Sequence, residues 1–136
     1  MANFVFGDCV EITCQHVLGR FSYFPKANES FTIDKGGIRN NDDANQLTAN
    51  GQLMIQKNRV RWYVEGPIAF DQISDDQMTT LNKITESPIT GTWTFSFLSG
   101  GIYTGNGMPV GDLNGDSNSG QMTLKVAGGG ILAEIS

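Results

Sequence analysis

Apolar and polar residues alternate along much of this chain, the spacing that places successive side chains on opposite faces of a β-strand. Residues 92–97, TWTFSF, put three aromatic side chains on one face, and residues 121–126, QMTLKV, do the same with Met, Leu and Val. In the first alternating run we expect Val10 and Ile12 to face inward. Shorter runs of this kind predict half-buried strands at residues 9–17, 19–24, 31–33 and 60–65.

Residues 38–51, IRNNDDANQLTANG, interrupt the alternation with many Asn and Asp residues. We expect a long polar loop there, and loops of more than a dozen residues in a compact domain commonly carry function. Residues 52–66, QLMIQKNRVRWYVEG, follow and predict a hairpin whose turn lies at residues 57–59. The expected fold is therefore a sandwich or barrel of antiparallel strands.

One segment, at about residues 75–85, has the pattern of a helix instead. Ser74 suits the N-cap, and the glutamine three residues later completes a capping box. The two acidic residues after Ser74 lie where the helix dipole favours negative charge, so we give them a capping role rather than a catalytic one. Met78, Leu81 and Ile84 form an apolar stripe that can pack on a sheet. We predict a mainly β fold with one short flanking α-helix.

Length, composition and charge narrow the picture further. The 136 residues suit a single domain, residues 1–136, and 17 glycines with only 17% charged residues favour strands and turns. The 14 acidic and 9 basic residues give a net charge of −5. Because phosphate binding needs clustered Lys and Arg, this charge argues against an electrostatic grip on nucleic acid. No run approaches the roughly 18 apolar residues of a membrane span, and the N-terminus lacks the pattern of a secretory signal, so we expect synthesis in a cytoplasm and no membrane partner.

Residues 111–120, GDLNGDSNSG, resemble half of a calcium-binding loop, because Asp112, Asn114 and Asp116 alternate as the first ligands of such a loop do. The glycine needed at position 6 and the bidentate acid needed at position 12 are absent. Asn, Asp, Ser and Gly also favour tight turns. We interpret these residues as a turn between two antiparallel strands, with a calcium site as the weaker alternative. No metal or other cofactor is expected.

No catalytic set stands out in the sequence. His16 is the single histidine and with Cys14 supplies two metal ligands at most, so we expect a partly exposed histidine on a strand. Asp42 and Asp43 lie in the polar loop, where nothing nearby would raise a carboxyl pKa for glycoside hydrolysis. A Gly-x-Ser-x-Gly turn and a phosphate-binding glycine loop are both missing. We expect a protein that is not an enzyme.

The two cysteines, Cys9 and Cys14, lie five residues apart. On one continuous strand they would point to opposite faces about 16 Å apart, too far to pair with each other. Two interpretations stay open. The thiols are either reduced and half-buried, or they form a disulfide between subunits in which Cys9 of one copy meets Cys14 of another.

In element order and in several short motifs the chain resembles the tail tube proteins of contractile phages and related injection machines. SFTIDKGGIRNN, at residues 30–41, is similar to the Gly-Gly-x-x-Arg turn after the second strand in that family. A strand ending in an acidic residue, a short helix and a closing strand then follow in the family's order. The segments that carry them are RWYVEG, MTTLNKIT, GTWTFSF, GIYTGNGMPVGDL and GGGILAEIS. The resemblance covers roughly residues 19–136.

This resemblance implies a β-sandwich-like barrel with a flanking helix, and a structural role. Six copies would form a ring whose inner strands join into one β-barrel. Stacked rings would then form a tube through which DNA passes during ejection without specific binding. The partners would be further copies of the chain and the tail sheath, baseplate and tail terminator proteins, in a virion made in the host cytoplasm. Arg39, Asp42 and Asp43 become candidates for polar contacts between stacked rings.

A second class of protein is kept open. A secreted calcium- or carbohydrate-binding β-sandwich would suit the calcium-like stretch together with Trp62 and Trp93, whereas the missing secretory signal argues against it. Rings or filaments of the purified protein would favour the tube subunit. A monomer that calcium stabilises would favour the binding module.

Overall fold

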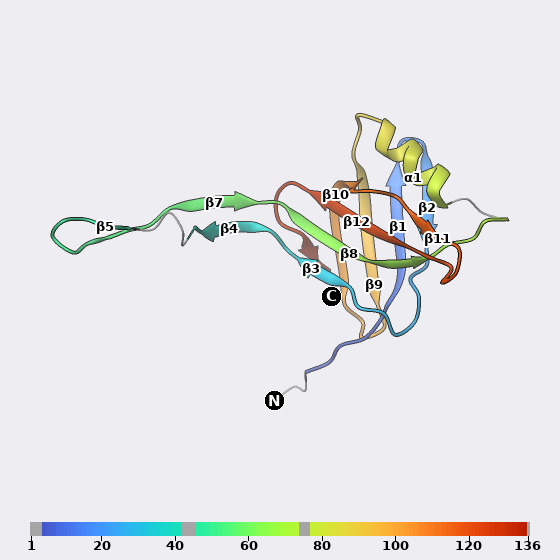
Figure 1. Ribbon diagram of the computed structural model, residues 1–136, viewed down its shortest axis with the longest axis horizontal. Helices are drawn as coiled ribbons and strands as arrows, with labels where there is room; N and C mark the ends of the chain where they lie inside the picture. Colours follow the sequence, from blue (N-terminus) through green and yellow to red (C-terminus); the bar gives the residue numbers. More distant parts are fainter. Residues whose placement is uncertain (1–3, 42–45, 74–76, 136) are drawn as a thin grey trace.

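The computed structural model describes residues 4–41, 46–73 and 77–135. In these ranges the chain forms 13 strands and one helix, α1 (Gln77–Glu86) (Figure 1). The strands are β1 (Cys9–His16), β2 (Gly19–Tyr23), β3 (Thr32–Asp34), β4 (Gly37–Asn40), β5 (Gln46–Leu47), β6 (Leu53–Met54), β7 (Lys57–Val60), β8 (Trp62–Ala69), β9 (Gly91–Phe97), β10 (Ile102–Val110), β11 (Gly115–Asp116), β12 (Gln121–Gly128) and β13 (Ala133–Glu134).

Nine of these strands form one antiparallel sheet, whose main path runs in the order β2-β1-β9-β10-β12-β8-β3. β10 changes partner along its length: residues 102–107 pair with β9, and residues 108–110 pair with β12. The sheet therefore folds over at β10 into two layers that cross one another (Figure 1). β13 adds to the first layer beside β10, and β11 adds to the second beside β12. The architecture agrees with the predicted mainly β sandwich or barrel with a single helix.

Apolar side chains from the two layers meet between them and form the core. The side chains that are at most 1% exposed include Ile12, Trp93 and Phe95 from the first layer and Trp62, Val64, Ile68, Met122, Leu124 and Val126 from the second. Trp62 packs edge-on against Phe95 across the layers, with ring centroids 6.3 Å apart. Each such side chain stabilises the fold by about 1.5–3 kcal/mol through its burial. The inward faces predicted for residues 92–97 and 121–126 are confirmed, with Phe97 only half-buried.

The Trp62 indole fits into this core because neighbouring positions on β10 and β12 are glycine. A Cβ on Gly105 would lie 2.9 Å from the indole ring, and one on Gly128 would lie 2.0 Å from a carbonyl oxygen of β10 and 2.9 Å from the indole Nε1. Glycine at both positions lets β10 and β12 approach the ring. The buried Nε1 of Trp62 has no hydrogen-bond partner among the described residues. Trp62 therefore contributes by packing, whereas the Trp93 Nε1 also donates to a β10 carbonyl at 3.1 Å.

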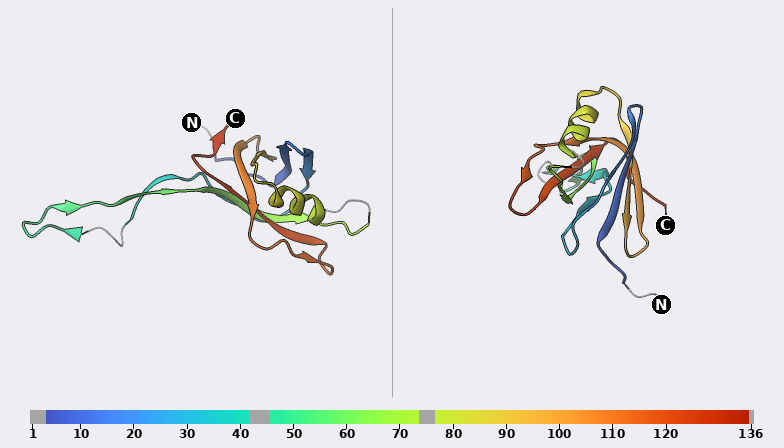
Figure 2. Two further views of the ribbon diagram at one scale, coloured as in Figure 1. Left: turned by 90° about the horizontal axis from the view of Figure 1, so that it is seen from above. Right: turned by 90° about the vertical axis from the view of Figure 1, so that its right-hand side faces the viewer.

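Helix α1 covers one end of the sandwich (Figure 2). Leu81 and Ile84 are fully buried and Met78 packs half-buried against the same core, so the predicted apolar stripe is confirmed. Tyr23 of β2 ties the helix to the first layer, since its hydroxyl lies 2.9 Å from the Thr80 Oγ1. The predicted N-cap lies outside the described residues, so the capping hypothesis stays a prediction.

The region expected to be a loop and a separate hairpin is one long two-stranded arm, described at residues 35–41 and 46–61, which projects from the rest of the protein, the body (Figures 1 and 2). β4 pairs with β7, and farther out β5 pairs with β6. The prediction of an irregular loop at residues 38–51 is therefore wrong for β4 and β5. The predicted turn at residues 57–59 is also wrong, because these residues belong to β7. The core covers neither face of this ribbon, so the apolar–polar alternation that located the other strands is missing.

The arm turns at its tip, between Thr48 and Gln52. The Thr48 amide donates to the Gln52 carbonyl at 2.7 Å, and the Gln52 amide donates to the Thr48 Oγ1 at 2.9 Å. The Gly51 amide donates to the Thr48 carbonyl at 2.9 Å, and Gly51 has a φ of +89°. This is the geometry of a three-residue hairpin loop with glycine in the left-handed position. The polar residues that suggested a loop thus supply the turn of a hairpin.

A bulge in β1 changes which of its side chains face the core. The register between β1 and β9 shifts between Cys9 and Glu11. The extra residue brings Cys9 to the same face as Ile12 and Cys14, and all three are buried while Val10 is 44% exposed. The expectations that Val10 faces inward and that the two cysteines occupy opposite faces are wrong, because they assumed an unbroken period of two.

Candidate functional site

The arm leaves the body at a sharply defined point. Asp34, the last residue of β3, forms an ion pair with the Arg39 guanidinium of β4 and accepts a hydrogen bond from the Gly36 amide at 2.9 Å. These two contacts, with Arg39 the larger cause, lower the pKa of Asp34. Gly36 has a φ of +73°, and a Cβ there would lie 2.7 Å from the Trp62 backbone nitrogen. Glycine is therefore required where the chain turns into the arm.

The C-terminal segment holds the base of the arm from the other side. The Leu132 amide donates to the Lys35 carbonyl at 2.9 Å, and Gly36 forms a bridge with Ile131. The Lys35 Nζ pairs with Glu134 at 3.5 Å on the surface. An exposed ion pair of this kind contributes little, so the backbone contacts and the fully buried Leu132 side chain do most to hold the base. The arm therefore has a defined direction relative to the body.

Several apolar side chains on the arm are exposed to solvent. They are Ile38, Leu47, Leu53, Met54 and Ile55, and each is between 52% and 67% exposed. A two-stranded hairpin by itself is only marginally stable in water. Grouped apolar residues on a surface mark interaction sites in folded proteins. The arm therefore has the composition of a segment that another surface covers.

Charge is divided unevenly between the arm and the body. Residues 35–61 hold five of the nine basic residues and two of the 14 acidic ones, a net charge of +3. The remaining residues hold four basic and 12 acidic residues, a net charge of −8. The five basic residues of the arm are Lys35, Arg39, Lys57, Arg59 and Arg61. The arm and the body therefore carry opposite net charges and are electrostatically complementary. Such complementarity favours the encounter of two protein surfaces and fixes their register.

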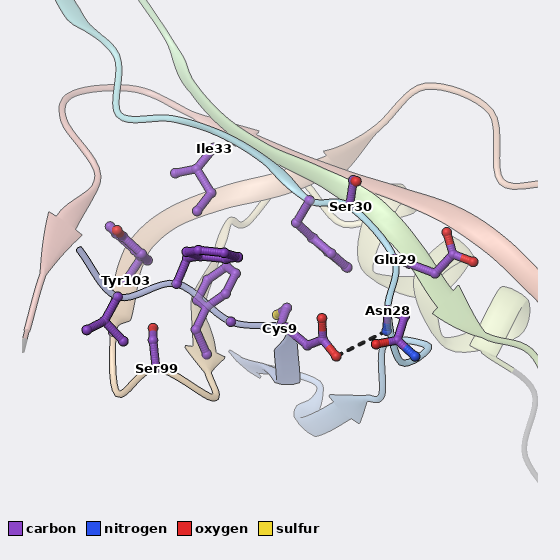
Figure 3. Close-up of a pocket in the computed structure, with 14 residues that line it drawn as sticks. Cys9, Asn28, Glu29, Ser30, Ile33, Ser99 and Tyr103 are labelled. Carbon is purple, nitrogen blue, oxygen red and sulfur yellow. Dashed lines mark hydrogen bonds between the residues drawn. The ribbon is translucent and has the colours of Figure 1, made fainter. Parts of the chain in front are cut away.

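A groove of about 580 Å³ lies on the body between the N-terminal segment and the residues that precede β3 (Figure 3). Its lining includes four aromatic and two acidic side chains, which are Phe6, Phe31, Phe97, Tyr103, Asp8 and Glu29. Phe97 and Tyr103 meet edge to face, with ring centroids 5.7 Å apart. Glu29 lies at the opposite end of the groove from Tyr103 (Figure 3). The groove is therefore apolar along one part and acidic at one end, and the described residues that line it include no Lys or Arg.

Backbone contacts hold the walls of this groove in place. The Asn28 amide donates to the Asp8 Oδ2 at 3.1 Å, and the Leu98 amide donates to the Asp8 carbonyl at 2.8 Å. The Phe31 ring packs against Gly66, where an added Cβ would lie only 2.5 Å from the ring. Asp8 therefore joins the N-terminal segment to the loops that contain Asn28 and Leu98. Glycine at position 66 of β8 leaves room for the Phe31 ring, which is part of the aromatic wall of the groove.

The three residues expected to contact a stacked ring are placed only in part. Arg39 lies on β4, where its half-exposed side chain is engaged with Asp34 of the same chain. Asp42 and Asp43 lie outside the described residues. A role for these three in contacts between rings stays a prediction, and Arg39 has an intramolecular role that the sequence did not indicate.

Residues 111–120 contain the predicted turn, since β11 and β12 are joined by a hairpin. The Asn118 amide donates to the Asp116 Oδ1 at 2.9 Å, and this bond is the largest cause of the lowered pKa of Asp116. The Asp116 carboxylate is thus used within its own turn. Asp112 and Asn114 are exposed. In the described part of the chain, no three His, Cys, Asp or Glu side chains gather as a metal site would require.

Both cysteines are free thiols buried in the core. Burial raises the pKa of the Cys9 thiol to about 12 and outweighs the opposing effect of the Glu11 carbonyl. Burial likewise raises the pKa of the Cys14 thiol to about 11. Both thiols are therefore protonated at neutral pH. This burial gives no support to a disulfide between subunits, which would require the core to open.

His16 is 5% exposed, so the expectation of a partly exposed strand histidine is wrong. The Leu18 amide donates to the His16 Nδ1 at 3.1 Å, so the Nε2 carries the proton and donates to the Ile89 carbonyl at 2.7 Å. His16 therefore joins the turn after β1 to the segment before β9. Because both ring nitrogens are used, the imidazole is a structural group here rather than a metal ligand.

No protein-family model matches this sequence, and no curated protein matches it either. Among the residues that the structure describes, no helix combines the length and the apolar character needed to cross a membrane.

Sequence reasoning missed the groove. The run FVF at residues 4–6 was the available indication, since Phe4 and Phe6 do not fit a buried strand face and are 97% and 93% exposed. Glu29 and Phe31 belong to a different part of the sequence, so no local pattern links them to residues 4–6. Their proximity follows from the path of the chain before β1 and before β3.

Proposed function

We propose that this protein is a structural subunit of a viral tail tube, in which hexameric rings stack into a channel that DNA traverses during ejection. The observation that carries the proposal is the arm, described at residues 35–41 and 46–61. It projects from the body, exposes apolar side chains and bears a charge opposite to that of the body. A second copy of the chain is the partner with the matching acidic surface.

The arm supports assembly because a monomer leaves its apolar side chains and strand edges exposed to solvent. Its outer strands, β5 and β6, pair only with each other among the described residues. Such a ribbon exposes apolar surface and edge hydrogen-bonding groups, which promote aggregation unless a partner covers them. Contact with a neighbouring ring would cover both. This is the role expected for the polar loop at residues 38–51, whose described residues belong to the arm instead.

The ends of the main sheet support the formation of a ring. β2 and β3 are the terminal strands of its path, so each has one edge without a strand partner in the described part of the chain. Edge strands pair readily with other chains, and pairing between neighbouring subunits would close the sheets of six copies into a barrel. The tail sheath, baseplate and tail terminator proteins enter the proposal through the resemblance, as does a virion location. We propose no enzymatic activity.

A secreted calcium- or carbohydrate-binding module has weaker support. The carboxylate at the centre of the calcium-like stretch, Asp116, is held by its own turn. Trp62 and Trp93, the tryptophans that could stack on a sugar, are both fully buried. No observation on the described residues favours this class over the tube subunit.

Removing the arm tests the proposal. Gly37 and Val60 pair directly across the arm, so Asn-Gly can replace residues 38–59 as a two-residue hairpin turn. We expect the full chain to form rings roughly 80–100 Å wide, or filaments of that width, in negative-stain electron microscopy. The truncated chain should not form filaments. Its melting temperature should change by less than about 4 °C, because none of the described residues in the deleted segment belongs to the buried core.

Two results would count against the tube subunit. A full chain that stays monomeric at high concentration would remove the basis for ring formation. A truncated chain that still forms full-length filaments would show that the arm does not mediate stacking. The melting temperature serves as the control, because it separates a lost contact from a lost fold.

A further inference from the structure

We propose that the groove between the N-terminal segment and residues 28–33 is the docking site for the outer part of the arm of a second copy. In this contact the exposed apolar side chains of the arm cover the aromatic wall of the groove. The basic residues of β7 meet the acidic end. The inference rests on the proposed self-assembly and names the surface that receives the arm.

The groove offers an apolar surface that the protomer leaves open. Phe31, Phe97 and Tyr103 pack partly buried against the core, and Phe6 lines the groove while remaining 93% exposed. The volume of about 580 Å³ lies in the range that suits several inserted side chains. An aromatic wall of this kind gains free energy when a partner removes it from water.

The acidic end of the groove has free charge. Glu29 is exposed and takes part in no ion pair among the described residues. Asp8 uses its Oδ2 for the Asn28 amide and is not in an ion pair either. With no Lys or Arg in the lining, this end attracts a basic partner.

The arm has the complementary chemistry. Leu53, Met54 and Ile55 are exposed and lie just before β7, which begins at Lys57. Arg59 of β7 is exposed and makes no ion pair among the described residues. On the arm, apolar side chains are followed by basic ones. Along the groove, aromatic side chains are followed by acidic ones, so the two surfaces have complementary chemistry in the same order.

The occupant must come from another copy. Figures 1 and 2 show the arm extending away from the body, with its tip remote from β3 and the N-terminal segment. The arm base is held by Asp34 with Arg39 and by the contacts of Lys35 with the C-terminal segment. The arm therefore does not fold back onto its own groove.

A charge exchange tests the contact. We expect Glu29→Lys and Arg59→Glu each to weaken self-association of the full chain by about fivefold to tenfold in sedimentation velocity. The double variant should restore it, because the two charges exchange places. Glu86→Lys is the matched control, since it makes the same charge change at an exposed residue on α1 and should leave association unchanged. Single variants that associate like the wild type, or a double variant no better than the singles, would overturn the proposal.

Crosslinking identifies the occupant directly. A Glu29→Cys chain mixed with a Met54→Cys chain should give a disulfide-linked dimer after mild oxidation, and Glu86→Cys mixed with Met54→Cys should not. The native thiols are buried and should stay unreactive. Crosslinking of Glu29→Cys to Phe4→Cys instead would place the N-terminal segment of a neighbour in the groove and overturn the proposal.

The two proposals fail separately. A wild-type chain that forms rings while Glu29→Lys leaves assembly unchanged refutes the docking site alone. A wild-type chain that forms no rings or filaments, yet gives the Glu29→Cys with Met54→Cys crosslink, refutes the tube subunit alone.

Discussion

The guanidinium of Arg39, on the first strand of the arm, pairs with the carboxylate of Asp34, on the last body strand before it. Only four residues separate the two along the chain, and Gly36 turns the backbone between them. The same Asp34 Oδ1 accepts the Gly36 amide at 2.9 Å. One carboxylate therefore fixes both the turn into the arm and the first strand of the arm.

This pair makes the base of the arm sensitive to acid. The Arg39 guanidinium and the Gly36 amide hold the pKa of Asp34 below its ordinary value of 3.8. A carboxyl with a lowered pKa contributes stability that is present above its ordinary pKa and is lost as the pH falls through the lowered value. We expect an NMR titration to give Asp34 a pKa below 3.8, and amides of β4 to exchange faster once Asp34 is protonated. An Asp34 that titrates at its ordinary value would contradict this prediction.

Gly36→Ala should destabilise the protein. Its φ of +73° disfavours any side chain, and the new Cβ would lie 2.7 Å from the Trp62 nitrogen and 2.8 Å from the Val60 oxygen. We expect a loss of about 2–4 kcal/mol in the free energy of unfolding, measured by chemical denaturation. Gly129→Ala is the control, because a Cβ there meets nothing within 4 Å, and it should cost less than about 0.5 kcal/mol. Equal effects of the two substitutions would refute the steric explanation.

The buried thiols should resist modification until the protein unfolds. The thiol pKa values of Cys9 and Cys14 are raised to about 12 and about 11, so at pH 8 neither offers the reactive thiolate. Mass spectrometry after alkylation should show labelling only in denaturant. A disulfide-linked dimer of the wild type on a non-reducing gel would contradict the burial and would favour the disulfide between subunits.

The same thiols predict a loss of stability at alkaline pH. Below the ordinary thiol pKa of 9.0 both states are protonated, and the contribution is constant. Between pH 9 and about 11, thiols ionise in the unfolded chain alone, which lowers the free energy of unfolding by about 1.4 kcal/mol per pH unit for each thiol. A Cys9→Ala, Cys14→Ala variant should lose less stability over this range. Parallel curves for the two proteins would show that other groups cause the decline.

Calcium should leave the melting temperature unchanged within about 1 °C. The Asp116 carboxylate already accepts the Asn118 amide, and no cluster of metal ligands occurs on the described residues. A genuine site filled at 100 times its Kd would stabilise the protein by about 2.7 kcal/mol, which differential scanning fluorimetry detects. Magnesium at equal ionic strength is the control. Stabilisation by calcium alone would favour the alternative binding module.

The sequence predicted the strands and the helix that bury one face, because burial of one face gives their apolar residues a regular spacing. Trp93 and Phe95, and Leu124 with its neighbours on β12, face the core as the alternation indicated. Leu81 and Ile84 of α1 do so at helical spacing. Each of these elements has one face in contact with the core, so the periodicity of its side chains records its structure.

The candidate surfaces were less predictable. The arm has no buried face, so its strands carry no alternation, and its Asn-rich composition suggested a loop. The bulge in β1 is a single extra residue, yet it reverses the expected faces of Cys9 and Val10. The groove joins residues 5–9 with residues 28–33 and 97–103, a proximity that no local pattern contains.

The sequence by itself determined a mainly β domain with one helix, an acidic net charge and the inward faces of its core strands, because hydrophobic burial acts on each element separately. Only the tertiary structure decided that residues 35–41 and 46–61 form a basic arm on an acidic body. The tertiary structure also decided that Asp34 fixes the base of this arm, and that an aromatic groove with an acidic end lies apart from it. These features depend on strand pairing between distant segments, which a one-dimensional pattern does not specify.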